Sequence, residues 1–83
     1  MIIDLHGKTL KEAKVIVNEE IDKAIKLKLN QIRIIYGYNS GNTLKNYFTN
    51  IKHYDSSKVT SIFEVPNNNG EAIINLKMNK KIV

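Results

Sequence analysis

The sequence of 83 residues contains no cysteine, and it has a single proline and a single arginine. Without cysteine the chain forms no disulfide, and it offers neither a thiolate metal ligand nor a cysteine nucleophile. No apolar run approaches the roughly 18 residues that cross a bilayer, and the start MIIDLH lacks the pattern of a signal peptide. These absences predict a cytoplasmic protein without a membrane partner, stabilised by packing alone.

Positive charge is in excess. The formal net charge is +5 and the sequence pI is about 9.5, which favours a polyanionic partner because clustered cations release counterions from a phosphate chain. Twelve of the thirteen cations are lysines, which lack the bidentate fork of arginine. The many lysines, asparagines and isoleucines also fit a bias in coding composition, so charge alone leaves nucleic acid as one of two explanations.

The hydrophobic pattern predicts one domain over residues 1–83, with elements in the order βαβαββ. Strands are expected at residues 2–5, 31–36, 58–65 and 71–78. A long helix follows Thr9, whose spacing to Glu12 is that of a capping box, and it extends to about residue 28. A second helix is expected over residues 43–52, and the loop PNNNG joins the last two strands as a hairpin.

Each helix allows a crossover connection, so the first two strands should be parallel and the third should be parallel to its neighbour. Their carboxyl ends then share one rim of an α/β sheet, where ligands tend to bind, and the N-terminus of the second helix would attract anions there. With both helices on one face, the period of two puts Ile3, Leu5 and Tyr36 in the core.

Asp4 and His6 lie on the side opposite to the helices by the same period, about 7 Å apart between alpha carbons. Together they could supply a carboxylate and a base for phosphodiester cleavage, and they are the candidate catalytic residues. The alternative is structural: Asp4 accepts backbone N–H bonds in the turn, and His6 holds the loop. A zinc site that pairs His6 with His53 is not expected, because His53 belongs to the opposite rim.

Three stretches, IDLHGKTLKEA, RIIYGYNSGNTLK and NGEAIINLK, resemble the small MutS-related (Smr) domain over residues 3–77. Asp4 to Gly7 match its first motif closely, and Gly70, Ala72 and Leu76 match the last. In the second motif, His-Gly-x-Gly, Gly37 matches, but Tyr36 stands where many members have histidine and Asn39 stands where they have glycine. The resemblance implies a two-layer sandwich with a four-stranded mixed sheet and two helices on one face.

The resemblance also implies binding of DNA or RNA, and in some members nicking or cleavage. Our first hypothesis is therefore a nucleic-acid-binding domain with metal-dependent endonuclease activity, for which magnesium or manganese would be the cofactor. The altered second motif favours the alternative, a non-catalytic nucleic-acid or protein interaction module that keeps only the fold. No metal is assigned, because a single carboxylate supplies few oxygen ligands for a magnesium ion.

Loop glycines, polar loop residues, aromatics and cations around the rim form the expected nucleic-acid contacts: Gly7, Lys8, Arg33, Tyr36, Gly37, Tyr38, Asn39, Ser40, Gly41, Asn42 and Lys45. For Arg33, a cross-strand pair with a glutamate is an equal alternative to a phosphate contact. The lysines of the C-terminal tail, Lys77, Lys80 and Lys81, are expected to be simply solvated.

Overall fold

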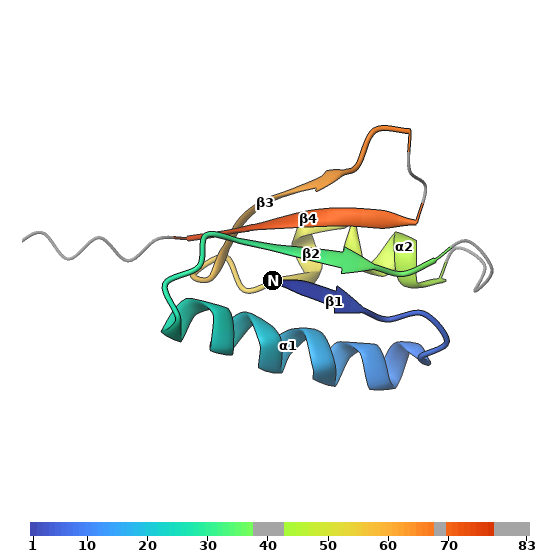
Figure 1. The fold of residues 1–83 in the computed structure, drawn as a ribbon, viewed down its shortest axis with the longest axis horizontal. Coiled ribbons are helices and arrows are strands. Elements are labelled where there is room, and N and C mark those ends of the chain that lie inside the picture. The colour runs from blue at the N-terminus through green and yellow to red at the C-terminus, as the bar shows by residue number, and fades with distance from the viewer. Residues whose placement is uncertain (38–42, 68–69, 78–83) are drawn as a thin grey trace, which may run out of the picture.

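The computed structural model describes residues 1–37, 43–67 and 70–77. Its elements follow the predicted βαβαββ order, with one short 3-10 helix added (Figure 1). They are β1 (Ile2–Asp4), α1 (Leu10–Lys26), β2 (Gln31–Ile35), α2 (Thr43–Phe48), the 3-10 helix η1 (Ile51–His53), β3 (Val59–Glu64) and β4 (Glu71–Leu76). Among the described residues, no helix combines the length and apolar composition that crossing a bilayer requires.

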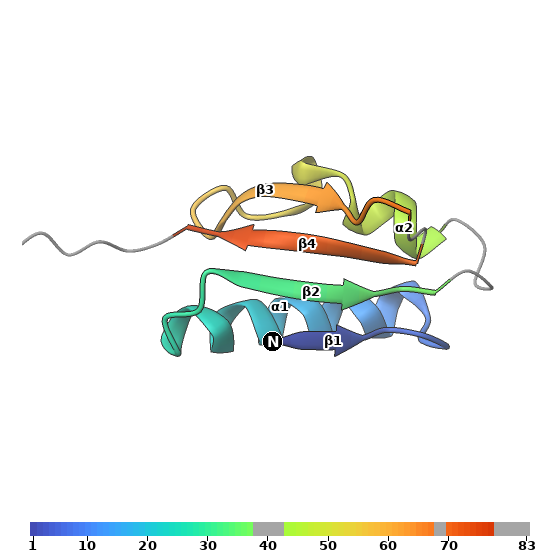
Figure 2. The same ribbon diagram turned by 45° about the horizontal axis from the view of Figure 1, so that its top comes forward.

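The four strands form one mixed sheet in the order β1-β2-β4-β3 (Figure 2). As predicted, β1 and β2 are parallel, with Ile3 opposite Ile34. The expectation that β3 is parallel to its neighbour is wrong, because β4 returns through the hairpin and lies between β2 and β3, antiparallel to both. Two antiparallel steps still leave β3 running in the direction of β1 and β2, so the carboxyl ends of these three strands share one rim.

Both helices pack on the same face of the sheet, which is the face behind the strands in Figure 2. The core combines inward-facing strand residues with one stripe of each helix: Ile3, Leu5, Ala13, Val17, Ile21, Ala24, Ile32, Ile34, Tyr36, Leu44, Phe48, Val59, Ala72, Ile74 and Leu76. This arrangement confirms the predicted fold class, a two-layer sandwich with a four-stranded mixed sheet.

The ends of α1 are closed by two different devices. At its start, Thr9 Oγ1 accepts a hydrogen bond from the Glu12 N–H (3.2 Å) and Glu12 Oε1 accepts one from the Thr9 N–H (2.9 Å), which is the predicted capping box. At its end, the Leu29 N–H donates to the Ala24 carbonyl and the Lys28 N–H to the Ile25 carbonyl. This is a Schellman closure, and it places Lys28 in the left-handed region at φ 59°.

The second helix ends at Phe48 and is shorter than the predicted 43–52, and side chains donate hydrogen bonds to its last carbonyls. Thr49 donates its hydroxyl to the Lys45 carbonyl (2.7 Å), and Tyr54 donates its hydroxyl to the Phe48 carbonyl (2.6 Å). The Asn50 side chain then caps η1 by accepting the Lys52 N–H. Ile51 lies in η1 and is 45% exposed.

Candidate nucleic-acid interface

The chain leaves β1 through a tight turn that fixes the first candidate residues. The Lys8 N–H donates to the Leu5 carbonyl (3.0 Å), and Gly7 adopts φ 77° inside this turn. Asp4 Oδ1 accepts the backbone N–H of His6 (2.9 Å), so the structural role considered for Asp4 is present. Leu5 is fully buried, whereas Asp4 and His6 on either side of it are exposed, as the period of two predicts. Both side chains are therefore accessible from solvent.

The ends of β1 and β2 and the beginning of β4 meet at one place. A Cβ atom on Gly37 would lie 3.7 Å from Cδ2 of His6, and the Gly70 carbonyl accepts the N–H groups of Tyr36 (2.9 Å) and Gly37 (3.2 Å). We call this surface the motif rim, made of His6, Gly7, Lys8, Gly37 and Gly70. It brings together segments that are more than 60 residues apart in the chain.

Tyr36 belongs to the core and not to the surface of the motif rim. Its side chain is 1% exposed, and its hydroxyl donates to the Glu71 carbonyl (3.1 Å). Burial raises the pKa of Tyr36, with smaller contributions from the carboxylates of Glu64 and Glu71, so the phenol stays protonated at neutral pH. The expected contact of Tyr36 with nucleic acid is therefore corrected: its ring continues the inward alternation of Ile32 and Ile34.

Two groups that the sequence predicted to attract anions are less suited to that role in the structure. The Gly37 N–H is directed to the Gly70 carbonyl and not to solvent. Helix α2 covers only six residues, which is too short to carry a strong dipole. The remaining predicted contacts of the loop, Tyr38, Asn39, Ser40, Gly41 and Asn42, lie outside the described residues.

The predicted cations of the interface differ in what they face. Lys8 is exposed in the turn, whereas Lys45 Nζ lies 3.5 Å from Glu64 Oε1. Arg33 lies on the open face of the sheet with its Nη1 4.0 Å from Glu71 Oε2, so the alternative of a cross-strand glutamate pair is realised, at the outer limit of an ion pair. Such exposed pairs are weak, and a phosphate can compete with either carboxylate.

The open face of the sheet carries a row of side chains that the sequence analysis did not single out. The strand register sets Ile2 opposite Arg33, Arg33 opposite Ile73, and Ile73 opposite Phe63. Phe63 is 57% exposed and Ile2 is 65% exposed, although both are large apolar side chains. The sequence does not predict an outward position for Phe63, because strict alternation from the buried Val59 would place Phe63 in the core.

The described residues do not form a metal site of ordinary composition. No group of three or more histidine, cysteine, aspartate or glutamate side chains converges in the part of the chain that the structure describes. The second histidine, His53, stacks on the ring of Tyr47 with centroids 4.0 Å apart, and its Nδ1 lies 2.8 Å from the Tyr47 carbonyl oxygen. Within residues 1–37, 43–67 and 70–77, Asp4 and His6 therefore have no third side chain of these types beside them.

Comparison with known proteins agrees with this geometry. A family model described as the Smr domain matches residues 3–74. The Smr domain of Thermus thermophilus MutS2 has a similar structure, with a TM-score of 0.78 and 23% sequence identity, over 92% of this chain and 96% of that chain. At this identity the similarity concerns the fold alone. A comparison with curated proteins found no match.

Proposed function

The chain belongs to the Smr domain family, and we propose from this membership that it binds DNA or RNA at the motif rim. Smr domains generally bind nucleic acids, and nicking endonuclease activity occurs in the family. The observation that carries the proposal is the meeting of His6, Gly7 and Gly37 at one rim, with Asp4 and His6 exposed beside the turn. The exposed Lys8 lies in the same turn and supplies a cation for a phosphate.

We further propose that Asp4 and His6 support cleavage of a phosphodiester bond. In such a step an oxygen nucleophile attacks phosphorus, the bond to the leaving oxygen breaks, and a proton moves from the nucleophile to the leaving oxygen. The imidazole of His6 is the group on the rim suited to accept or donate that proton. Asp4 orients the turn by accepting the backbone N–H of His6.

The test uses labelled single-stranded and double-stranded DNA and RNA, each with and without magnesium or manganese. His6→Ala should abolish cleavage. Asp4→Asn should reduce it while the fold persists, because an asparagine oxygen still accepts the His6 N–H. His53→Ala is the matched control, since His53 is the other histidine and contacts Tyr47 away from the rim. Cleavage that survives His6→Ala would contradict the catalytic proposal.

Binding is measured on the same four polymers with the wild-type protein. We expect affinity to fall steeply with salt, because the candidate contacts are lysines and not base-reading side chains. If no polymer is bound at low salt, the proposed function fails.

The alternative function is a non-catalytic interaction module. The observation that favours it is the exposed apolar row on the open sheet face, where Phe63 and Ile2 flank Ile73 and Arg33. Large apolar side chains exposed on one face can contribute to a protein–protein contact. The alternative would be supported by an absence of cleavage by the wild-type protein in every condition, together with loss of self-association or partner binding in Phe63→Ser.

A further inference from the structure

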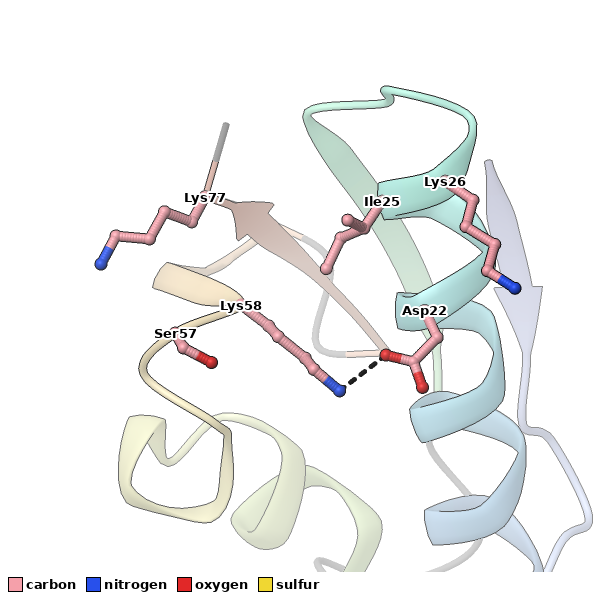
Figure 3. Close-up of a pocket in the computed structure, with 6 residues that line it drawn as sticks. All are labelled: Asp22, Ile25, Lys26, Ser57, Lys58 and Lys77. Carbon is pink, nitrogen blue, oxygen red and sulfur yellow. Dashed lines mark hydrogen bonds and ion pairs between the residues drawn. The ribbon is translucent and has the colours of Figure 1, made fainter. Parts of the chain in front are cut away.

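A pocket lies at the C-terminal end of α1, whose N-terminal end follows the motif rim. Figure 3 shows its lining residues. Its volume is about 550 Å³. It lies where the last turns of α1, the turn before β3 and the residue after β4 come together. We call it the basic pocket, and its lining residues are Asp22, Ile25, Lys26, Ser57, Lys58 and Lys77. Three of these six side chains are lysines and one is a carboxylate, so its net charge is positive.

Lys58 crosses the pocket, and its backbone is firmly placed. Its N–H donates to the Asp55 carbonyl (2.9 Å), and its carbonyl accepts the N–H of Lys77 (2.8 Å). The side chain extends toward α1, where its Nζ lies 2.7 Å from Asp22 Oδ1. Hydrogen bonding to Asp22 raises the pKa of Lys58, followed by the charge of the same carboxylate. Lys58 is therefore a charged side chain that is paired with Asp22 across the pocket.

The other two lysines lie at the edges. Figure 3 shows Lys26 and Lys77 on opposite sides of Lys58, with their ammonium groups pointing outward, while Ile25 points into the space between them. Lysine side chains are long and flexible, so both ammonium groups can turn toward a bound anion. The negative end of α1 is worth about half a charge and does not outweigh them.

We infer that the basic pocket binds a phosphate group of the nucleic-acid backbone, as a second contact remote from the motif rim. Both partners of the Lys58–Asp22 pair are partly exposed, so the pair is weak and a phosphate can displace the carboxylate from Lys58. The pocket lining holds no histidine, and its role is binding and not cleavage. This inference rests on the proposed function, because it supposes that the ligand is a polynucleotide.

The distance between the two sites sets a minimum length for the ligand. Gly70 at the motif rim and Lys77 at the pocket flank β4 and lie seven residues apart, which corresponds to about 23 Å at 3.3 Å per residue. A strand that advances about 3.4 Å per phosphate needs at least about seven nucleotides to span this distance. Shorter oligonucleotides reach only one of the two sites.

The experiment measures affinity by fluorescence anisotropy for a 20-nucleotide strand and a 3-nucleotide strand over a range of salt. For the long strand, Lys58→Gln and Lys77→Gln should each reduce the slope of log K against log salt by about 1. Lys52→Gln is the matched control, because it removes the same charge from an exposed position of η1 that belongs neither to the pocket lining nor to the motif rim. Asp22→Asn should tighten binding, because it releases Lys58. None of the pocket variants should affect the short strand differently from the control.

The outcomes separate the inference from the function on which it rests. If the wild-type protein binds no polynucleotide, both fail. If it binds but Lys52→Gln weakens binding as much as Lys58→Gln, only overall charge matters and the pocket is not a site. Inorganic phosphate is the second probe: if it shifts the amide signals of Ser57 and Lys58 while the long strand does not, the pocket serves a free anion and the inference is wrong. Circular dichroism must show that each variant is folded.

Discussion

The two ends of α1 lie at opposite rims of the sheet, and the residues around the two ends differ in kind. At the motif rim the backbone is tightly specified, by the capping box at Thr9 and by left-handed glycines at positions 7 and 37. At the opposite rim the helix closes with Lys28 in a conformation that favours glycine, and three lysines gather around a pocket. The first rim carries defined geometry and chemical groups, and the second carries charge. Our proposals accordingly assign contacts with nucleic acid to both ends of the domain and cleavage to the motif rim alone.

Among the tests of this contrast between the two rims, Leu5→Ala should have the largest effect on stability. Leu5 is fully buried between the exposed Asp4 and His6, so truncation leaves a cavity directly beneath the motif rim. We expect a loss of about 2 to 5 kcal/mol in the free energy of unfolding, a large part of the stability of a small domain. Urea denaturation measures it, with Ile2→Ala on the open face as the control. An equal effect of both substitutions would contradict the assigned core.

Gly37→Ala should have the next largest effect. Gly37 adopts φ 80°, which costs an L-residue about 1 to 2 kcal/mol, whereas the added Cβ meets His6 only at ordinary contact distance. Gly37→Asn should cost less, because asparagine tolerates the left-handed region better. If alanine and asparagine are equally destabilising in urea denaturation, crowding and not φ is the cause.

Thr9→Ala should destabilise the protein by about 1 kcal/mol, the usual contribution of an N-cap side chain. Thr9 Oγ1 accepts the Glu12 N–H, which would otherwise lack a helical partner. Thermal unfolding followed by circular dichroism measures the loss. Thr9→Ser keeps the acceptor and should retain most of the stability; a loss as large as that of alanine would argue against the cap.

Lys28→Gly should stabilise the opposite end of α1 by about 0.5 to 1 kcal/mol, because glycine avoids the cost of φ 59° at the helix end. Lys28→Gln removes the same charge and keeps the strain, so it should bring no gain. Urea midpoints at unchanged m-value provide the measurement. A gain from glutamine equal to that from glycine would assign the effect to charge.

The smallest expected effects are changes in how the free energy of unfolding depends on pH. Glu12 is the group concerned at the motif rim, and Lys58 is the group at the opposite rim. Bonds from the backbone and side chain of Thr9 lower the pKa of Glu12, so its contribution is present above the unfolded value of about 4.5 and is lost as pH falls through the folded value. The pKa of Lys58 is raised, so its contribution is present below the unfolded value of about 10.5 and is lost as pH rises through the folded value.

Glu12→Gln should therefore flatten the acid side of a curve of unfolding free energy against pH, and Lys58→Gln should flatten the alkaline side. Denaturant midpoints across the pH range record both curves. If a substitution leaves its side of the curve unchanged, the contact that it removes does not contribute to the pH dependence of stability.

Much of the fold follows from signals that are local in the sequence. The capping box, the alternation around Leu5 and the apolar stripe of α1 each depend on residues a few positions apart, and the structure confirms them. The end of α2 could not be predicted in this way. It depends on the hydroxyl of Tyr54, which reaches the Phe48 carbonyl from beyond the helix, and no helical period records such a contact.

For the candidate site, the sequence placed Asp4, His6 and Gly37 at one rim, because parallel strands end together. It could not decide between the surface and the core for Tyr36, since the strand alternation and the glycine loop indicated different environments. The buried hydroxyl contact with Glu71 settles the position of its ring. The proposed catalytic roles of Asp4 and His6 stay predictions that the cleavage assay addresses.

By itself, then, the sequence determined the order of the elements, the capped start of α1 and the shared rim, because these depend on short-range periodicity and on turn residues. Only the tertiary structure decided three further features. Strand β4 inserts between β2 and β3, an extra residue at Thr60 turns Phe63 to the open face, and Lys26, Lys58 and Lys77 meet around one pocket. Each depends on which strands pair and in which register, and pairing energies between distant segments leave no period in the sequence.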